Sequence, residues 1–209
     1  MALALTGFSV VAGALLGWVN GVTAEPIAQA NAKALSEAIA LVVPGFDNNP
    51  AASPDTVEVN GATYIIYNAT KGGQPIGAAV ESASNGFGGT LKVLVGFDNE
   101  GNIIDYSLLS HSETPGLGSK AATWFKKGAK GDITGKNPGQ EALTVSKDGG
   151  KIDAITASTI TSRAFLLAIN NAYAAYKNEH VDGASGASQQ KETAEKCDAD
   201  TTNVEPVKE

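Results

Sequence analysis

Residues 56–67, TVEVNGATYIIY, contain the clearest secondary-structure signal in this chain. Two runs of β-branched and aromatic residues flank the dipeptide Asn60-Gly61, and this combination is typical of a two-residue β-hairpin turn. A second pair of apolar runs, Leu91 to Phe97 and Ile103 to Leu109, flanks the turn sequence DNEG at residues 98–101. The two patterns predict a pair of antiparallel hairpins.

Helical and extended segments are expected on both sides of these hairpins. Ile27 to Val42 is expected to form a helix, because Pro26 suits a first helical turn and Pro44-Gly45 would end the helix. The other expected elements are a loop at Phe46 to Asp55, a strand at Pro75 to Glu81, a short helix at Lys120 to Lys127, a strand at Leu143 to Ser146 and a helix at Phe165 to Tyr176. This order of elements predicts an α+β domain with antiparallel strands rather than a doubly wound sheet.

The first 24 residues contain no charged side chain. As a helix with ~1.5 Å rise per residue, the apolar run Ala2 to Val22 is roughly 30 Å long, enough to cross a bilayer core. A signal peptide and a buried soluble helix are the alternatives, but a basic leading segment is missing and the run is long for a signal peptide. Small residues at every fourth position favour close helix packing in lipid; they are Ser9, Gly13, Gly17 and Gly21. We therefore expect residues 1–24 to form one transmembrane helix that packs against membrane subunits of a complex.

The C-terminal segment differs in composition from the rest of the chain. Residues 181–209 hold seven acidic and three basic side chains, a net charge of −4 against −7 for the whole chain. A segment so poor in large apolar residues cannot bury enough surface to fold alone, so we expect a disordered acidic tail. The remaining residues divide into a connecting helix at 25–43 and one folded domain at 44–180. The acidic balance and the lack of a basic patch argue against nucleic-acid binding.

Residues 153–162, DAITASTITS, place an acidic residue and a cluster of small and hydroxyl residues directly before the expected C-terminal helix. Small residues allow a ligand to approach the backbone closely, and the first turn of a helix offers free N–H groups and a partial positive charge to a phosphate. The hydroxyls could bond to that phosphate or be joined to it. An ordinary helix N-cap, where Ser and Thr are favoured, is the alternative interpretation.

Two glycine-containing loops lie upstream of this segment. HSETPGLG at residues 111–118 combines a rigid Thr-Pro-Gly turn with permissive glycines, so it could fold over a flat aromatic ligand. His111 and Glu113 alone could indicate a metal pair, but no third ligand residue stands at a suitable spacing, and the other histidine, His180, is distant. NGFGG at residues 85–89 is either part of the same site or a flexible surface loop.

All three segments resemble motifs of the FMN-binding domain family. DAITAST at residues 153–159 is similar to the family's flavinylation motif, which is Asp, two variable residues, Ser or Thr, Gly, Ala, and Thr or Ser. HSETPGLG is similar to the signature His-x-Glu-Thr-Pro-Gly-Leu-Gly, and NGFGG to a Gly-aromatic-x-Gly loop. In that family a dedicated flavin transferase esterifies the phosphate of FMN to the last hydroxyl of the motif. This chain departs from the motif at Ala157, where Gly is usual, and at Ser158, where Ala is usual.

The resemblance implies that Thr159 carries covalently attached FMN as a phosphoester, with Asp153 and Thr156 in the matching motif positions. Trp124 and Phe125 are candidates to stack on the flavin ring, with packing in the core as the alternative. No catalytic residue and no metal site are expected. The implied cofactor site comprises Glu113, Thr114, Pro115, Gly116, Leu117, Gly118, Trp124, Asp153, Thr156, Ala157, Ser158, Thr159, Thr161 and Ser162.

The domain together with the apolar N-terminus resembles the G subunits of Rnf electron-transport complexes, which are related to the C subunits of sodium-translocating NADH:quinone reductases. Such complexes couple electron exchange between ferredoxin and NAD to ion transport. The resemblance implies an electron-relay subunit, embedded by one helix in the cytoplasmic (inner) membrane, with its globular domain on the periplasmic or extracytoplasmic side. Its partners would be other membrane subunits and the flavin transferase, and it would have no independent active site. The alternatives are a quinone reductase C subunit, a membrane-tethered adaptor without flavin, and the flavin-bearing part of another extracytosolic reductase.

Overall fold

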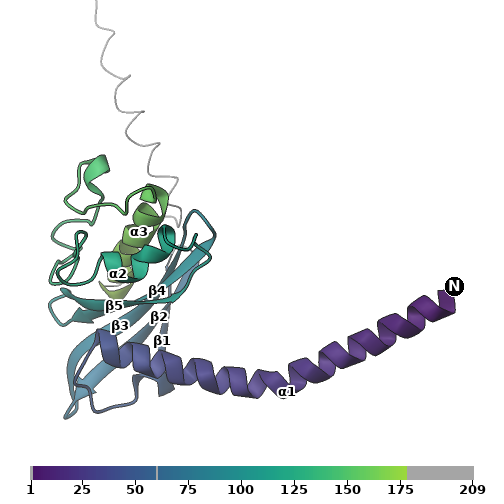
Figure 1. The fold of residues 1–209 in the computed structure, drawn as a ribbon. Helices are drawn as coiled ribbons and strands as arrows, with labels where there is room; N and C mark the ends of the chain where they lie inside the picture. The colour runs from purple at the N-terminus through teal and green to yellow at the C-terminus, as the bar shows by residue number, and fades with distance from the viewer. Residues whose placement is uncertain (1, 60, 178–209) are drawn as a thin grey trace, which may run out of the picture.

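The structure, a computed structural model, describes residues 2–59 and 61–177. The expected acidic tail at 181–209 and the expected end of the domain at residue 180 lie outside the described residues. An antiparallel five-stranded sheet forms the centre of the fold, with helices on both faces (Figure 1), which confirms the predicted α+β class. In chain order the helices and strands are α1 (Ala2–Val42), β1 (Asp55–Val59), β2 (Ala62–Lys71), β3 (Gln74–Asn85), β4 (Thr90–Asp98), β5 (Ile103–Ser110), α2 (Ala121–Trp124) and α3 (Thr159–Lys177), with 3-10 turns at Pro50–Ala52, Gly118–Lys120 and Ser146–Asp148.

One continuous helix, α1, covers both the expected transmembrane helix and the expected connecting helix. Pro26 lies inside it, whereas the sequence pattern placed this proline at the start of a second helix. A proline removes one backbone hydrogen bond, but good helix formers on both sides, here mostly alanines, let the helix continue with a bend. Figure 1 shows a bent α1 that extends away from the domain over most of its length. Within Ser9–Val42 the helix is long and apolar enough to cross a membrane, with mean hydropathy 1.3 and 0% burial over its most apolar window.

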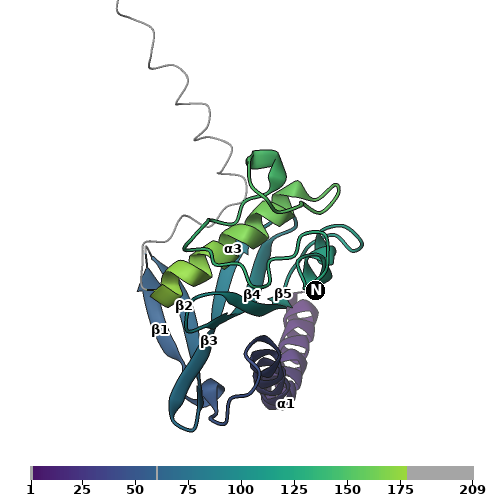
Figure 2. The same cartoon turned by 90° about the vertical axis from the view of Figure 1, so that its left-hand side faces the viewer.

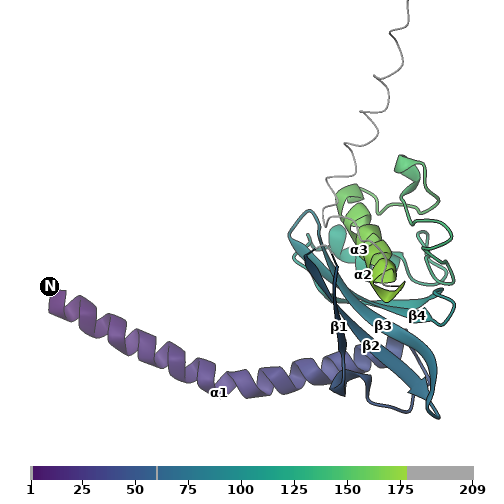
Figure 3. The same ribbon diagram turned by 180° about the vertical axis from the view of Figure 1, so that it is seen from behind.

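The sheet is a meander in which each strand pairs with the next one along the chain. Both predicted hairpins are confirmed, because Val59 pairs with Ala62 across the first turn and Phe97 pairs with Ile103 across the second. Strand β3 is longer than predicted and continues to Asn85. Figure 3 shows β1 at one edge of the sheet, and β5 forms the opposite edge.

Strand β4 is buried on both faces, and its alternating residues belong to two separate cores. Val93, Val95 and Phe97 pack in the core that contains α3, while Leu94 packs with the last turns of α1. Figure 2 shows α3 and α1 on opposite faces of the sheet. The period of two residues along a strand is the reason that one strand can serve both layers.

The end of α1 lies very close to the sheet. A Cβ at Gly96 would lie 2.0 Å from the carbonyl oxygen of Val42, so only glycine permits this approach. Ile39 and Val42 are fully buried at the same contact. The apolar N-terminal helix is therefore attached to the domain by side-chain packing as well as by the chain itself.

The connection between α2 and α3 does not contain the strand predicted at Leu143 to Ser146, so that prediction is wrong. Only Val145 forms an isolated bridge, to Ile152. The side chain of Asn170 accepts from the N–H and donates to the carbonyl of Leu143, both at 3.0 Å, where a neighbouring strand would otherwise do so. Leu143 and Val145 are buried in the core. Their apolar, β-branched pattern therefore reflects a buried loop.

Three aromatic rings pack together in the core next to α2. Phe125 stacks on Phe165 with ring centroids 4.4 Å apart, and Tyr106 meets Phe165 edge-on at 4.8 Å. The Tyr106 hydroxyl donates to the Ala121 carbonyl at 2.7 Å and so anchors α2, which is shorter than the predicted helix at Lys120 to Lys127. Phe125 is thus a core residue, as the alternative interpretation expected, and is not available to stack on a ligand.

Ser82 and Ser84 are buried hydroxyls on the same face of β3 that differ in hydrogen bonding. Ser84 donates to the Ala164 carbonyl at 2.6 Å, whereas Ser82 Oγ has no partner among the described residues. We expect Ser82→Ala to raise the free energy of unfolding by about 1 kcal/mol, because it removes an unsatisfied hydroxyl, and Ser84→Ala to lower it by about 1–2 kcal/mol. Chemical denaturation of the two variants measures this difference in sign. A loss of stability in Ser82→Ala would contradict the expectation.

Candidate functional site

The segment 153–162 forms the turn that leads into α3. The side chain of Ser162 holds this turn, because its Oγ accepts from the Ile155 N–H and donates to the Ser158 carbonyl, both at 2.9 Å. Ser162 is fully buried and Ser158 nearly so. These bonds fix the backbone just before the helix, so that Thr159 becomes the first helical residue.

Ala157 adopts a backbone conformation that usually requires glycine. Its φ is +60°, and no other non-glycine residue among those the structure describes has a positive φ. The left-handed region places Cβ too close to the following carbonyl oxygen, so it is occupied mainly by glycine. Ala157 stands where the resembled motif has glycine. This chain thus adopts, with alanine, a conformation that glycine would adopt without strain.

The first turn of α3 offers free hydrogen-bond donors. The first intrahelical bond runs from the Ser162 N–H to the Ser158 carbonyl at 3.0 Å, so the N–H groups of Thr159, Ile160 and Thr161 have no acceptor within residues 2–59 and 61–177. The turn also carries no acidic side chain. Free N–H groups and the helix dipole give this turn a partial positive charge that suits an anion.

A buried carboxylate joins this turn to two loops. Glu113 is only 5% exposed. Its Oε2 accepts a hydrogen bond from Thr161 Oγ1 at 2.7 Å, and its Oε1 accepts one from the Gly88 N–H at 3.2 Å. A buried carboxylate is tolerated only when it is paired or hydrogen bonded. These bonds therefore hold loop 111–118 against both α3 and loop 85–89.

Glycines make the close packing around Glu113 possible. A Cβ at Gly86 would lie 2.0 Å from Glu113 Oε1, and a Cβ at Gly118 would lie 2.5 Å from Oε2. A Cβ at Gly88 would lie 2.2 Å from the carbonyl oxygen of Ser112. Real Cβ atoms do not approach other atoms so closely, so these positions need glycine for space rather than for flexibility.

The three segments enclose a cavity of about 310 Å³ next to Thr159. Three large apolar side chains at this cavity are open to solvent, with exposed fractions of 71% for Phe87, 40% for Leu117 and 37% for Ile160. Exposed apolar side chains gathered around a cavity are typical of a binding site. The lining consists of Phe87, Glu113, Thr114, Leu117, Gly118, Ala157, Ser158, Thr159, Ile160 and Thr161.

Most of the residues implied by the sequence meet at this cavity, and the others lie outside its lining. Those that meet are Glu113, Thr114, Leu117, Gly118, Ala157, Ser158, Thr159 and Thr161. Pro115, Gly116, Asp153 and Thr156 are exposed, and Ser162 is buried beneath the turn. Trp124 is half-buried and donates its indole N–H to the Asp153 carbonyl at 2.8 Å, so it supports the motif from outside the cavity.

Three residues at or beside Thr159 and the cavity were not among the implied site residues. Phe87 stands in the NGFGG loop, whose aromatic residue between glycines was the available signal. Ile160 is a large apolar residue at the otherwise polar start of α3, which could have marked it. Lys147 is twelve residues from Thr159, and no pattern in the sequence links the two.

Lys147 approaches the site from the 3-10 turn Ser146–Asp148. Its Nζ donates to Thr159 Oγ1 at 3.1 Å. The adjacent Asp148 accepts two hydrogen bonds from the Arg163 guanidinium, at 2.6 and 2.7 Å. Hydrogen bonding from Arg163 lowers the pKa of the Asp148 carboxyl, and the same bond raises the pKa of Arg163. Both groups are therefore charged at neutral pH.

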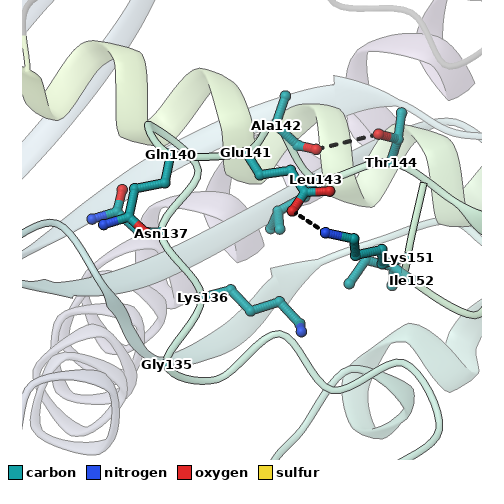
Figure 4. A pocket seen from close by; sticks show the side chains of 10 residues that line it. All are labelled: Gly135, Lys136, Asn137, Gln140, Glu141, Ala142, Leu143, Thr144, Lys151 and Ile152. Atoms are coloured by element: carbon teal, nitrogen blue, oxygen red, sulfur yellow. Dashed lines mark hydrogen bonds and ion pairs between the residues drawn. The ribbon is translucent and has the colours of Figure 1, made fainter.

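A larger hollow of about 480 Å³ lies along the connection between α2 and α3 (Figure 4). An ion pair between Lys151 Nζ and Glu141 Oε2, 2.6 Å apart, lines it, and both side chains are mostly exposed. None of the motif residues lines this hollow. We place the candidate site at the smaller cavity, because a buried carboxylate, free helix N–H groups and exposed apolar side chains converge there.

Ala157→Gly is expected to raise the free energy of unfolding by about 0.5–1 kcal/mol, because glycine adopts a positive φ without a Cβ clash. This figure is a net gain, since the greater freedom of glycine in the unfolded chain offsets part of the relief. Ala154→Gly is the matched control, since Ala154 is half-buried in the same segment and has no positive φ. The control is expected to be destabilising. Thermal unfolding of both variants tests this, and a less stable Ala157→Gly protein would contradict the strain at residue 157.

Glu113→Ala is expected to lower the free energy of unfolding by about 2–3 kcal/mol, because it leaves the Thr161 hydroxyl and the Gly88 N–H without their buried acceptor. Glu113→Gln should cost less than about 1 kcal/mol, since an amide offers an acceptor to Gly88 and a donor to Thr161. Denaturation curves of the two variants measure the difference. Equal losses would show that the carboxylate charge, rather than these hydrogen bonds, holds the loops.

Comparison with known proteins agrees with the position of this site. The FMN-binding domain family matches residues 86–174, which include the cavity. The G subunit of the ion-translocating oxidoreductase complex of Vibrio cholerae serotype O1 is 35% identical over 190 residues, covering 85% of this chain and 89% of its own length. The corresponding G subunits from Yersinia pestis and Cereibacter sphaeroides are 35% identical over 181 residues (81% and 86% covered) and 34% identical over 166 residues (76% and 75% covered). The chain therefore belongs to the family of ion-translocating oxidoreductase complex G subunits, and its residues 86–174 are an FMN-binding domain.

Proposed function

We propose that this chain is the electron-transfer subunit of a membrane-bound, ion-translocating ferredoxin:NAD oxidoreductase of the Rnf type, with FMN esterified to Thr159. The observation that carries the proposal is the position of Thr159. It is the first residue of α3 and lines the cavity that the Glu113 hydrogen bonds hold together. The flavin supplies the electron-transfer chemistry, while the protein holds it and sets its surroundings.

The first turn of α3 fits the phosphate of FMN. Its free N–H groups, at Thr159, Ile160 and Thr161, are donors for phosphate oxygens, and the helix dipole favours a negative charge at this end. The Thr159 hydroxyl is the oxygen available for the ester. The turn carries no acidic side chain that would repel the phosphate.

The apolar side chains at the cavity fit the flavin ring. Phe87, Leu117 and Ile160 offer exposed apolar surface to a flat aromatic ring, whose dimethylbenzene part is apolar. A cavity of about 310 Å³ is at the small end of ligand pockets, so part of the ring would stay open to a neighbouring protein. An open ring can exchange electrons with a partner but is held weakly by contacts alone. A phosphoester keeps such a flavin in place.

The backbone at Ala157 and Ser158, the two departures from the motif, favours a flavin-bearing subunit over an adaptor without flavin. Ala157 adopts a left-handed conformation, which glycine, the usual residue at this position of the motif, accepts readily. Ser158 forms no side-chain hydrogen bond among the described residues, so its extra hydroxyl does not alter the turn. The names of the relatives also favour the G subunit of an ion-translocating oxidoreductase over a quinone reductase C subunit.

Helix α1 supports a place in a membrane complex. Leu16 and Trp18 are 71% and 70% exposed, so this chain does not cover its own apolar helix within the described residues. We assign the expected transmembrane segment, residues 1–24, as the single span in the cytoplasmic (inner) membrane, with the domain on the periplasmic or extracytoplasmic side, as the resemblance implies. Other membrane subunits would cover the helix, and a flavin transferase would attach FMN.

Thr159→Ala is expected to abolish covalent flavin while leaving the domain folded, because loss of one hydroxyl at a helix start costs only about 1 kcal/mol. Ser158→Ala is the matched control and should keep the flavin. The measurement is flavin fluorescence of the denatured full-length protein in a gel, after expression together with a flavin transferase. If Thr159→Ala fluoresces and Ser158→Ala does not, the flavin is attached to Ser158, one residue from the proposed site. A wild-type protein without fluorescence would favour the adaptor.

A further inference from the structure

We propose that Lys147 is a binding residue for the phosphate on Thr159 and supplies the positive charge that faces it. The inference rests on the proposed function, because it requires a flavin phosphate on that threonine. Lys147 belongs to none of the three motifs and comes from a separate turn of the chain, Ser146–Asp148.

Lys147 already contacts the oxygen that would be esterified. Its Nζ donates to Thr159 Oγ1 at 3.1 Å. Among the described residues it forms no direct ion pair: its charge acts on the carboxylate of Asp148 only through space, and that carboxylate is hydrogen bonded to Arg163. The charge of Lys147 is therefore available to an anion attached at Thr159.

The turn that presents Lys147 is closed by its own backbone. The Ser146 N–H donates to the Ile152 carbonyl at 2.8 Å, and the Ile152 N–H donates to the Thr144 carbonyl at 3.2 Å. Gly150 has no room for a side chain, since a Cβ there would lie 2.1 Å from the Thr144 carbonyl oxygen. The position of the Lys147 backbone is thus defined by the fold.

An ion pair fixes this turn to α3. Asp148 and Arg163 share two hydrogen bonds of 2.6 and 2.7 Å, and their side chains are 27% and 14% exposed. Arg163 follows Thr159 by four residues, so the two lie on one face of the helix. A two-bond contact between a guanidinium and a carboxylate sets orientation as well as distance. Asp148 and Arg163 are therefore positioning residues that bring Lys147 to Thr159.

The chemistry of a phosphodiester suits this arrangement. It carries one negative charge and two non-bridging oxygens that accept hydrogen bonds. The free N–H groups of α3 are neutral donors, and Lys147 adds a charged donor, whose hydrogen bonds to anions are about twice as strong as neutral ones. Attachment of the flavin phosphate thus turns a lysine–hydroxyl bond into an ion pair. Flavin attachment should stabilise the protein more when Lys147 is present.

The test compares flavin-loaded and flavin-free forms of the full-length protein. The two forms are expressed with and without a flavin transferase and are purified in detergent. We expect Lys147→Gln to reduce the rise in Tm on flavin attachment by about 2–4 °C, and to change the Tm of the flavin-free form by less than about 1 °C. If Lys147 had a purely structural role, Lys147→Gln would lower the Tm of the flavin-loaded and flavin-free forms equally. Loss of flavin attachment in a Lys147→Gln protein with unchanged flavin-free Tm would also support the proposal.

Two variants serve as controls. Lys151→Gln removes the same charge from the other end of the turn, where the lysine pairs with Glu141, and should keep the full rise in Tm and full flavin content. Lys147→Arg retains the charge and should behave like the wild type. The role of Lys147 would be overturned if flavin attachment raised the Tm of Lys147→Gln as much as that of the wild type. It would also be overturned if Lys147→Gln and Lys151→Gln reduced this rise in Tm equally. Neither outcome would contradict flavin attachment at Thr159. A wild type without flavin would overturn the proposed function and this inference together.

Discussion

The candidate site depends on one buried carboxylate. Glu113 accepts a hydrogen bond from the loop after β3 through Gly88 and one from the first turn of α3 through Thr161. These segments are far apart in the sequence. Because burial of an unpaired carboxylate would be costly, the two hydrogen bonds hold the segments together around Glu113. The packing is so tight that a Cβ at Gly86 or Gly118 would displace the Glu113 carboxylate from these bonds. Thr159, the candidate attachment residue, lies beside the cavity because the loops pack against the start of α3.

The sheet joins this site to the long N-terminal helix. Strand β4 packs against α3 on one face and against the end of α1 on the other, and the second contact is close enough to require Gly96. The apolar helix and the candidate flavin site are thus held on opposite sides of one buried strand. If the N-terminal part of α1 crosses the membrane as proposed, this packing sets the position of the flavin domain relative to the membrane subunits. Such a fixed position would suit electron transfer between neighbours.

Local chemistry in the sequence predicted the two hairpins, because Asn60-Gly61 and the turn at residues 98–101 specify their own geometry. It did not predict that Leu143 to Ser146 is a loop, because Asn170, a distant residue, takes the place of a partner strand. At the site, the motifs identified the segments that line the cavity, including Glu113 and Thr159. They did not show that Ser162 and Trp124 support the turn from outside, nor that Lys147 reaches Thr159, because these contacts depend on tertiary packing.

On the proposed function, Thr159 at the first turn of α3 carries FMN as a phosphoester. Peptide mass spectrometry of the full-length protein, purified from membranes of cells that contain a flavin transferase, tests it most directly. Trypsin cleaves after Lys151 and Arg163, so one peptide from Ile152 to Arg163 holds the whole motif. We expect this peptide to gain the mass of FMN less one water, with fragment ions that place the gain on Thr159. An unmodified peptide, or a gain on Thr156 or Ser158, would contradict it.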